Sequence, residues 1–301
     1  MTTPRLDAIR TEQRNPRTND LDAMSTVEFL TVMNDEDARV AAAVRAALPK
    51  IAQAVDAIAE RMRRGGRLIY CGAGTSGRLG VQDAAECEPT FSAQPGQVVG
   101  LIAGGPGAML RAVEGAEDDP GLGGRDLDAI ALRADDCVVG LAASGRTPYV
   151  IGALQHARQR GALTVAVVCS DHSAVAAAAE IPIEVLPGPE ILTGSTRLKA
   201  GTAQKLVLNM LSTGAFVRLH KVYGNLMVDL MATNVKLKAR SLRIVEQATQ
   251  CEAAVAAATL QRCQGEVKTA IVVLLTGASP EIARARLSAA AGSVRLALRG
   301  S

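Results

Sequence analysis

Three turns in this sequence place serine or threonine beside glycine and arginine, a combination suited to binding an anion. They span residues 72–78, 144–147 and 193–197. The first two follow apolar runs that predict strands, and the third precedes a long helical segment. Backbone N–H groups at the start of a helix point toward an anion, and nearby hydroxyls add donors. Each turn alone fits an ordinary helix cap, but together the three predict a phosphate site.

Hydroxyl side chains are the main candidates for contact with this phosphate. They are Thr75, Ser76, Ser144, Thr147, Ser195 and Thr196. Other residues of the same segments are further substrate-binding candidates. They are Gly74, Arg78, Arg146, Glu190 and Arg197. The arginine side chains could bind a phosphate or a carboxylate of the substrate, and could equally hold loops to helix ends by hydrogen bonds. The Glu190 carboxylate could accept hydrogen bonds from sugar hydroxyls, and a role in holding its own loop is an equal alternative.

Acidic residues gather in two stretches that follow the first glycine-rich turn. They are Asp83, Glu86, Glu88, Glu114, Glu117, Asp118 and Asp119. Two carboxyl groups in different protonation states can serve as general acid and general base without a metal. Any one of these carboxylates, taken alone, is more simply a solvated charge at a helix end.

Two other kinds of site are excluded by what the sequence lacks. The pattern Gly72-x-Gly74-x-x-Gly77 fits a dinucleotide fingerprint, which needs an acidic residue after the second strand. Residues 101–105 end that strand as LIAGG, without a carboxylate, so an NAD site is rejected. The six cysteines show no CxxC pair and no histidine at metal spacing, so we expect no metal and no disulfide.

The 301 residues have ordinary globular composition, 48% hydrophobic and 21% charged. The net charge of +3 comes without a basic block, so nucleic acid and anionic membrane are not expected partners. No apolar run reaches the roughly 18 residues of a membrane span. The N-terminal segment lacks the apolar core of a signal peptide. These features predict a cytoplasmic protein.

Short apolar runs alternate along the chain with segments whose pattern predicts helices. Strands are expected at 67–71, 98–102, 136–142, 163–168 and 181–186, and helices at about 76–86, 107–116, 148–160, 173–179 and 197–219. This alternation predicts an α/β fold with a doubly wound, mostly parallel sheet. In such sheets the loops at the carboxyl ends of the strands converge. We expect an N-terminal arm with helices at 1–50, the sheet domain at 51–240 and a small helical subdomain at 241–301. Length does not decide between strand and helix for residues 270–275.

One stretch is much more specific than the turns themselves. Residues 188–205 read GPEILTGSTRLKAGTAQK and resemble the signature shared by N-acetylmuramic acid 6-phosphate etherases and glucokinase regulatory proteins. Further stretches resemble the sequences of these etherases. They are residues 34–37, 66–80, 113–118, 144–150 and 224–229. Length and these matches identify the chain as similar to the etherase family over almost its whole extent. The three turns together resemble those of a sugar isomerase (SIS) domain, a fold that binds phosphosugars.

The resemblance implies a carbon–oxygen lyase of cell-wall amino-sugar recycling. Such an enzyme converts N-acetylmuramic acid 6-phosphate to N-acetylglucosamine 6-phosphate and D-lactate, by elimination across C2–C3 and then addition of water. It implies no metal and no organic cofactor. By the same resemblance, Glu86 is the proton donor to lactate and Glu117 the base at C2. Glu88 stands where the sequences of the family have a proline, so this chain departs from the family pattern beside the proposed acid.

Helix geometry leads to a further expectation. Ser76 and Glu86 are ten residues apart, which is about 15 Å along one straight helix. A phosphosugar holds its phosphate closer than that to its reacting carbons. We therefore expect a homodimer whose sites lie near the subunit interface and combine residues of both chains.

Two alternatives remain open at this stage. A non-catalytic phosphosugar-sensing regulator would keep residues 188–205 but would need neither Glu86 nor Glu117. An aldose–ketose phosphosugar isomerase would share the fold and the ring opening, and would leave the ether intact.

Overall fold

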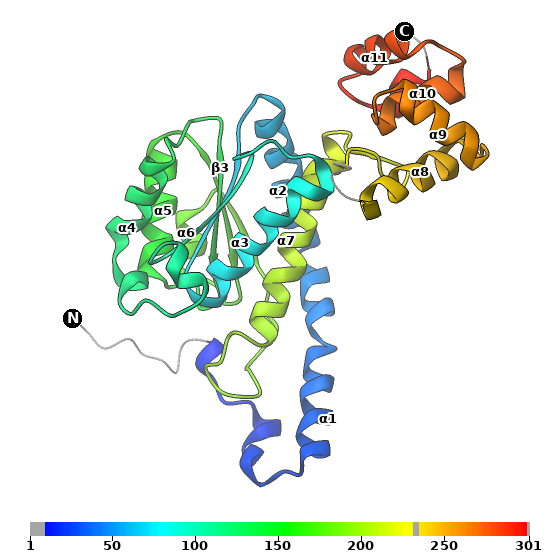
Figure 1. Ribbon diagram of the computed structural model, residues 1–301. Helices are drawn as coiled ribbons and strands as arrows, with labels where there is room; N and C mark the ends of the chain where they lie inside the picture. The colour runs from blue at the N-terminus through cyan, green and yellow to red at the C-terminus, as the bar shows by residue number, and fades with distance from the viewer. Residues whose placement is uncertain (1–9, 231–234, 300–301) are drawn as a thin grey trace. The chain divides into compact units, whose positions relative to one another are not determined.

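The computed structural model describes residues 10–230 and 235–299 (Figure 1). The chain divides into two compact units. The first comprises the residues up to 85 together with 96–212, and the second comprises 86–95 together with the residues from 213 onward. Helices α3 (Gly74–Phe91) and α7 (Lys199–Arg218) contribute residues to both units. The boundaries at 50 and 240 that the sequence suggested remain predictions.

A five-stranded parallel sheet forms the centre of the first unit, which confirms the predicted fold class. Its strands are β1 (Leu68–Gly72), β2 (Val98–Ile102), β3 (Cys137–Ala142), β4 (Leu163–Val168) and β5 (Ile181–Glu184). Their spatial order is β2-β1-β3-β4-β5. The direction of winding therefore reverses between β1 and β3, and ligands of open α/β sheets bind outside the carboxyl ends of strands at such a point. Two of the three predicted phosphate turns follow these two strands.

Helices cover both faces of this sheet. In Figure 1, α4 (Pro120–Ala129), α5 (Pro148–Gln159) and α6 (Ala174–Ala178) lie on one side, and α2 (Val40–Arg63), α3 and α7 lie on the other. Helix α1 (Thr26–Asp37) precedes them and begins with a capping box between Ser25 and Glu28. Helix α2 continues through Pro49, although proline is unfavourable in the interior of a helix.

The segment between β2 and β3 differs from the prediction. The prediction of a helix at 107–116 is wrong, because the chain forms only two 3-10 turns there, at Pro106–Met109 and Ala116–Asp118. The glycines beside these turns, Gly104, Gly105 and Gly115, have positive φ angles that an α-helix does not use. Helix α4 was not predicted, because its sequence PGLGGRDLDA is rich in poor helix formers.

Close packing of α4 on α5 explains why glycines are used there. A Cβ atom at Gly152 would lie 1.7 Å from the Pro120 carbonyl oxygen, and one at Gly123 would lie 2.4 Å from the Tyr149 carbonyl oxygen. The two helices approach so closely that no side chain fits at either position. Tertiary packing therefore outweighs the low helix propensity of glycine.

Replacing Gly152 with alanine should lower the free energy of unfolding by about 3 kcal/mol, because one helix must shift to admit the methyl group. Urea denaturation of the variant and the native chain measures this loss. Gly107→Ala is the matched control, since a Cβ atom at Gly107 meets nothing within 4 Å. Equal stability of all three chains would show that α4 and α5 are free to separate.

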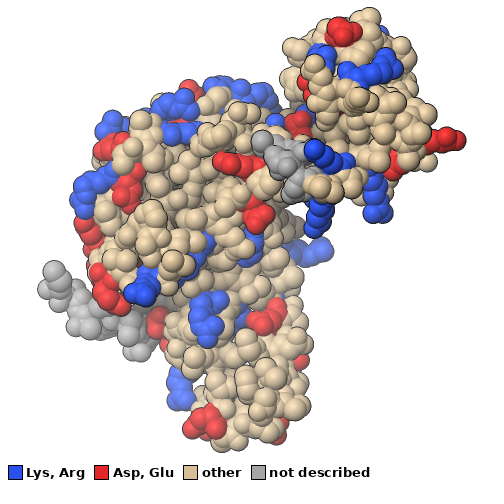
Figure 2. Space-filling view, viewed as in Figure 1, with Lys and Arg blue, Asp and Glu red and all other residues tan. Residues whose placement is uncertain are grey.

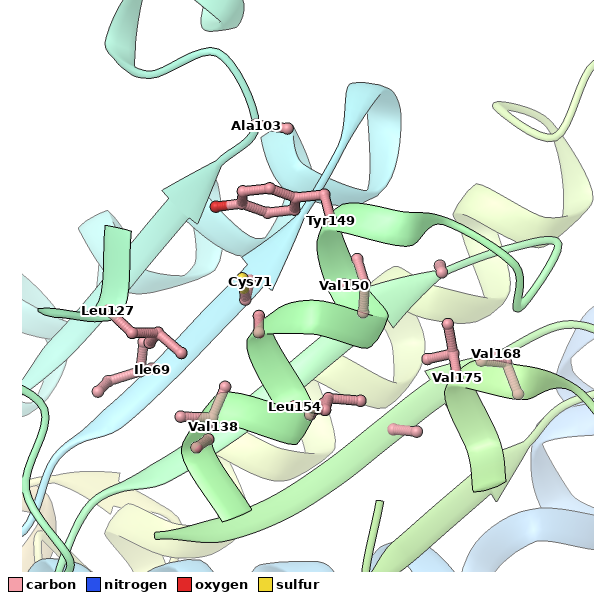
Figure 3. Close-up of a cluster of buried hydrophobic side chains, with 14 of the residues drawn as sticks. Ile69, Cys71, Ala103, Leu127, Val138, Tyr149, Val150, Leu154, Val168 and Val175 are labelled. Atoms are coloured by element: carbon pink, nitrogen blue, oxygen red, sulfur yellow. The ribbon is translucent and has the colours of Figure 1, made fainter. Parts of the chain in front are cut away.

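The core between the sheet and α5 is apolar and closely packed (Figure 3). Tyr149 is fully buried there, and its hydroxyl donates to an Asp126 carboxylate oxygen at 2.8 Å. The Cys71 and Cys169 thiols are buried and free, and burial raises the pKa of each to about 12. Thiols in this state are protonated and inert at neutral pH, so these cysteines serve as small core residues.

The second unit is helical apart from a short hairpin, β6 (Val222–Tyr223) and β7 (Leu226–Met227). Its helices are α8 (Val235–Thr249), α9 (Ala253–Arg262), α10 (Val267–Thr276), α11 (Pro280–Ala289) and α12 (Val294–Ala297). Residues 270–275, whose structure the sequence did not decide, belong to α10. Residues 270–274 pack in a separate apolar cluster with residues of the other helices, whereas Leu275 is exposed.

The helices α9 and α10 recur as α11 and α12, 27 residues further along the chain. Residues 260–271 read LQRCQGEVKTAI and residues 287–298 read LSAAAGSVRLAL, with glycine of positive φ at the same place in both. Both copies place a cation on the hairpin segment. Lys268 Nζ lies 2.7 Å from Asp229 Oδ2, and the Arg295 guanidinium lies 5.9 Å from the centre of the Tyr223 ring. Residues 253–297 thus form a tandem repeat of a helix pair, in which the second helix is shorter in the second copy, and the sequence analysis did not predict this repeat.

Basic and acidic side chains are interspersed over the face shown in Figure 2. Within the described residues, no helix combines the length and apolar character needed to cross a membrane.

Candidate functional site

A pocket of about 150 Å³ opens beside the carboxyl end of β1. Its lining comes from two segments, the turn after β1 and the chain between β2 and α4. The residues are Ala73, Gly74, Arg78, Ala103, Ala108, Ala112, Val113, Glu114, Gly115 and Glu117. Of the predicted site residues, it brings together Gly74, Arg78 and Glu117. The start of α3 and a carboxylate therefore line one small space.

Glu117 lies in the 3-10 turn Ala116–Asp118, which Gly115 precedes with a φ of 73°. Its side chain is exposed, as is that of Glu114. A carboxylate that keeps contact with water and lines a pocket can exchange a proton with a ligand there. Both carboxylates meet this requirement, so geometry alone does not choose between them.

Arg78 lines the same pocket but is held by the chain. Its guanidinium donates to the carbonyl oxygens of Met109 and Ala108, at 3.1 and 2.7 Å. These bonds fix the 3-10 turn that forms the opposite wall of the pocket. The contacts favour the loop-tying role over direct phosphate binding.

Thr75 and Ser76 occupy the first turn of α3, as a phosphate-binding turn requires. Gly77 makes this turn possible, because a Cβ atom there would lie 2.6 Å from the Gly72 carbonyl oxygen. Ser76 is only 8% exposed, and its hydroxyl donates to Gln204 Oε1 at 2.8 Å. Gln204 lies on α7 and is the residue of this region that the sequence analysis missed. Its one sequence signal is its place within the specific stretch 188–205.

The second predicted turn follows β3. Ser144 is half-buried, and its hydroxyl oxygen accepts from the Arg146 backbone N–H at 3.4 Å. Thr147 is the N-cap residue of α5, with no capping bond from its side chain. The Arg146 side chain is exposed. The hydroxyls of this turn are available to a ligand.

The third turn is positioned by a buried carboxylate. Glu190 is 1% exposed, and its two oxygens accept from the backbone N–H groups of Lys199 and Ala200 at 3.0 and 2.9 Å. Burial raises the pKa of Glu190 despite these bonds. Because both oxygens serve the start of α7, the contacts favour the loop-holding role for Glu190. Ser195 and Thr196 remain half-buried in the turn before it, and Arg197 is exposed.

Other acidic candidates divide into bonded and exposed groups. Asp83 is buried, and it accepts from the Tyr70 hydroxyl at 2.9 Å and from Lys205 Nζ at 3.3 Å. Asp119 caps α4, and its bond from Arg125 lowers its pKa. Glu86 and Glu88 are exposed on α3. Neither lines the pocket that holds Glu117.

Comparison with known families finds two matching models. Residues 50–158 match the glucokinase regulatory protein N-terminal SIS domain, and residues 125–214 match the SIS domain.

Curated relatives named N-acetylmuramic acid 6-phosphate etherase are similar over almost the whole chain. The protein of Mycolicibacterium smegmatis is 58% identical over 97% of this chain and 98% of its own length. That of Erwinia tasmaniensis is 58% identical, covering 98% and 96%. That of Yersinia pestis is 59% identical, covering 97% and 99%. Among solved structures, a phosphoheptose isomerase from Francisella tularensis aligns with a TM-score of 0.49 at 15% identity, over 64% of this chain and all of its own.

Proposed function

The chain belongs to the N-acetylmuramic acid 6-phosphate etherase family, and from this premise we propose how its own residues carry out the reaction. As a carbon–oxygen lyase, it converts N-acetylmuramic acid 6-phosphate to N-acetylglucosamine 6-phosphate and D-lactate in cell-wall amino-sugar recycling. The observation that supports our assignment of residues is the pocket in which Glu117 faces the glycine-rich start of α3.

Ether cleavage needs an activated carbon, because an alkoxide is a poor leaving group. Opening of the sugar ring gives an aldehyde at C1, which acidifies the C2 proton. Glu117 removes this proton, and Glu86 protonates the lactyl oxygen as the C3–O bond breaks. A C2–C3 double bond results, and D-lactate leaves with its own oxygen. Water then adds its hydroxyl to C3, and C2 regains a proton.

The substrate phosphate is bound, in this proposal, by the hydroxyls and backbone N–H groups of the three turns. Ser76, Ser144 and Ser195 supply the first hydroxyls, supported by Thr75, Thr147 and Thr196. The exposed Arg146 and Arg197 are available to the phosphate or to the lactyl carboxylate. The reaction takes place in the cytoplasm, because a charged sugar phosphate does not cross a membrane unaided.

Heavy-oxygen water tests the reaction directly. The protein is incubated with N-acetylmuramic acid 6-phosphate in this water, and the products are analysed by mass spectrometry. We expect unlabelled D-lactate and one heavy oxygen on C3 of N-acetylglucosamine 6-phosphate. Intact substrate despite measurable binding would favour the phosphosugar-sensing regulator. A ketose phosphate that keeps its lactyl ether would favour the isomerase.

We further propose that the enzyme is a homodimer with sites near the subunit interface, and that each site uses residues of both chains. Helix α3 carries both Ser76 and Glu86, and ten helical residues span about 15 Å. That is longer than the distance from the phosphate of the substrate to its reacting carbons. One α3 therefore supplies the phosphate turn, and the α3 of the partner supplies the acid.

Mixed dimers test this arrangement. Ser76→Ala and Glu86→Gln chains are each expected to be nearly inactive. Unfolding and refolding them together in equal amounts should restore about a quarter of native activity, because each mixed dimer then has one intact site. The same treatment of each variant alone is the control. Mixed dimers without restored activity would show that every site is built from one chain.

A further inference from the structure

The pair formed by Ser76 and Gln204 has an unusual arrangement of hydrogen-bond donors. The Ser76 hydroxyl donates its only proton to Gln204 Oε1, since a carboxamide oxygen can only accept. Ser76 thus offers a ligand lone pairs alone. A phosphate dianion is also an acceptor, so Ser76 in this state cannot donate a hydrogen bond to it.

The other end of the same amide has no partner. Gln204 is 1% exposed, and its Nε2 is one of three buried side-chain polar atoms without a hydrogen bond among the described residues. A buried donor left unsatisfied in this way costs about 1–3 kcal/mol. Such a cost is expected where a polar group serves a second arrangement of the site.

The part of α7 just before Gln204 lies against two of the predicted phosphate turns. A Cβ atom at Gly201, on the preceding turn of α7, would lie 3.5 Å from Thr75 Cγ2 and 3.6 Å from the Thr196 carbonyl oxygen. Gly201, one helical turn before Gln204, therefore lies beside both turns, and the Gln204 amide holds the serine of the first.

Rotation of the Gln204 amide by roughly 180° about its last side-chain bond exchanges the positions of its oxygen and nitrogen with little change of shape. Nε2 then donates to Ser76 Oγ, and the serine proton becomes free for another acceptor. Oε1 becomes the unsatisfied atom, so one buried polar group without a partner replaces another. A bound phosphate that accepts the serine proton adds a hydrogen bond only in the second orientation, and therefore favours it.

We propose that Gln204 is a positioning residue that decides whether Ser76 offers the substrate a proton or a lone pair, and that phosphate binding turns its amide. This inference rests on the proposed binding of a phosphosugar at the first turn. It assigns the serine to direct contact and the glutamine to a role exerted through the serine.

Coupling between the two side chains is the first test. Affinity for N-acetylglucosamine 6-phosphate is measured by calorimetry for Ser76→Ala, Gln204→Met and the double variant. We expect losses of about 30-fold for Ser76→Ala and about 5-fold for Gln204→Met. The double variant should be no weaker than Ser76→Ala, because the glutamine acts only through the serine. Losses that multiply in the double variant, or native affinity in Gln204→Met, would overturn the proposal.

A charged replacement gives the largest effect. In Gln204→Glu a carboxylate accepts the serine proton permanently and adds a negative charge, so affinity should fall by about 100-fold or more. Ser212→Ala is the matched control, since Ser212 is a buried polar residue of the same helix whose hydroxyl donates to the Leu208 carbonyl oxygen. Its affinity should remain native. Thermal denaturation of every variant checks that it is folded, and native affinity in folded Gln204→Glu would overturn the proposal.

The turning of the amide has a spectroscopic signature in the native protein. Its side-chain NH₂ signals in a ¹⁵N–¹H spectrum are identified by their loss in Gln204→Met. Saturation with N-acetylglucosamine 6-phosphate should move one of them downfield, whereas N-acetylglucosamine without phosphate should not. In Ser76→Ala the shift should be absent. Signals that stay in place in the native protein would refute the turning.

The inference and the proposed reaction can fail separately. If the native protein binds the phosphosugar with these signatures but leaves the ether intact, the reaction is wrong and the role of Gln204 stands. If the ether is cleaved normally while Gln204→Glu binds like the native chain, the role of Gln204 alone is wrong.

Discussion

Replacing Glu117 with glutamine should lower the rate of ether cleavage by about 1,000-fold. Glutamine keeps the shape of the side chain in the pocket but cannot accept the C2 proton, and proton transfer by a placed side chain contributes about 10²- to 10⁴-fold. The rate is measured as D-lactate released from N-acetylmuramic acid 6-phosphate. Incorporation of deuterium from solvent at C2 should be lost to a similar extent.

Glu114→Gln is the matched control, because Glu114 is also exposed and lines the same pocket. It should retain activity within about 10-fold. Glu86→Gln separates the two roles, since it should stop lactate release while C2 exchange continues. If Glu114→Gln loses activity and Glu117→Gln remains active, the base is Glu114 and not Glu117. Loss of C2 exchange in Glu86→Gln would reverse the assignment of acid and base.

Replacing Glu36 with glutamine should give the largest loss of stability, about 3–5 kcal/mol. Lys199 is 1% exposed, and its Nζ donates to Glu36 Oε2 at 2.6 Å and to the Pro187 carbonyl oxygen at 3.1 Å. The variant leaves this buried ammonium without its ion-pair partner, and breaking a buried pair in this way costs several kcal/mol. Chemical denaturation followed by circular dichroism measures the loss.

Lys199→Met is the paired variant. It should lose less stability, because Glu36 keeps Arg17 and Arg39, which lie 3.1 Å from its Oε1. The double variant should be more stable than the sum of the two losses predicts. If both single variants unfold within 1 kcal/mol of the native chain, the pair contributes no net stability.

The same pair gives a pH dependence. Burial acts to raise the pKa of Glu36, but the bonds from Lys199 and Arg17 outweigh it and hold the pKa below its ordinary value. A carboxyl whose pKa is lowered on folding stabilises the protein at pH values above its unfolded pKa. That contribution is lost as the pH falls through the lower pKa of the folded state. The loss of stability between neutral and acidic pH should therefore be smaller in Glu36→Gln than in the native chain.

Much of the fold could be predicted from local sequence. The strands β1 to β5 are short runs of apolar residues, and they lie within a few residues of the expected positions. Strands covered by helices on both faces must be apolar throughout, so composition reveals them. Helix α4 could not be predicted in this way, because Gly123 is favoured there by the contact with α5 and by nothing in its own sequence.

The sequence by itself also determined the chemistry of the site: the hydroxyl-rich turns, the acidic residues and the family signature are properties of short segments. Which of these residues are free to act was decided only by tertiary structure. Glu190 is occupied by the start of α7, Arg78 by the carbonyls of the facing turn, and Ser76 by Gln204, 128 residues away in the chain. The physical reason is that a donor or acceptor already used in a hydrogen bond within the protein is not available to a ligand. Partners distant in sequence form such bonds only when the chain folds.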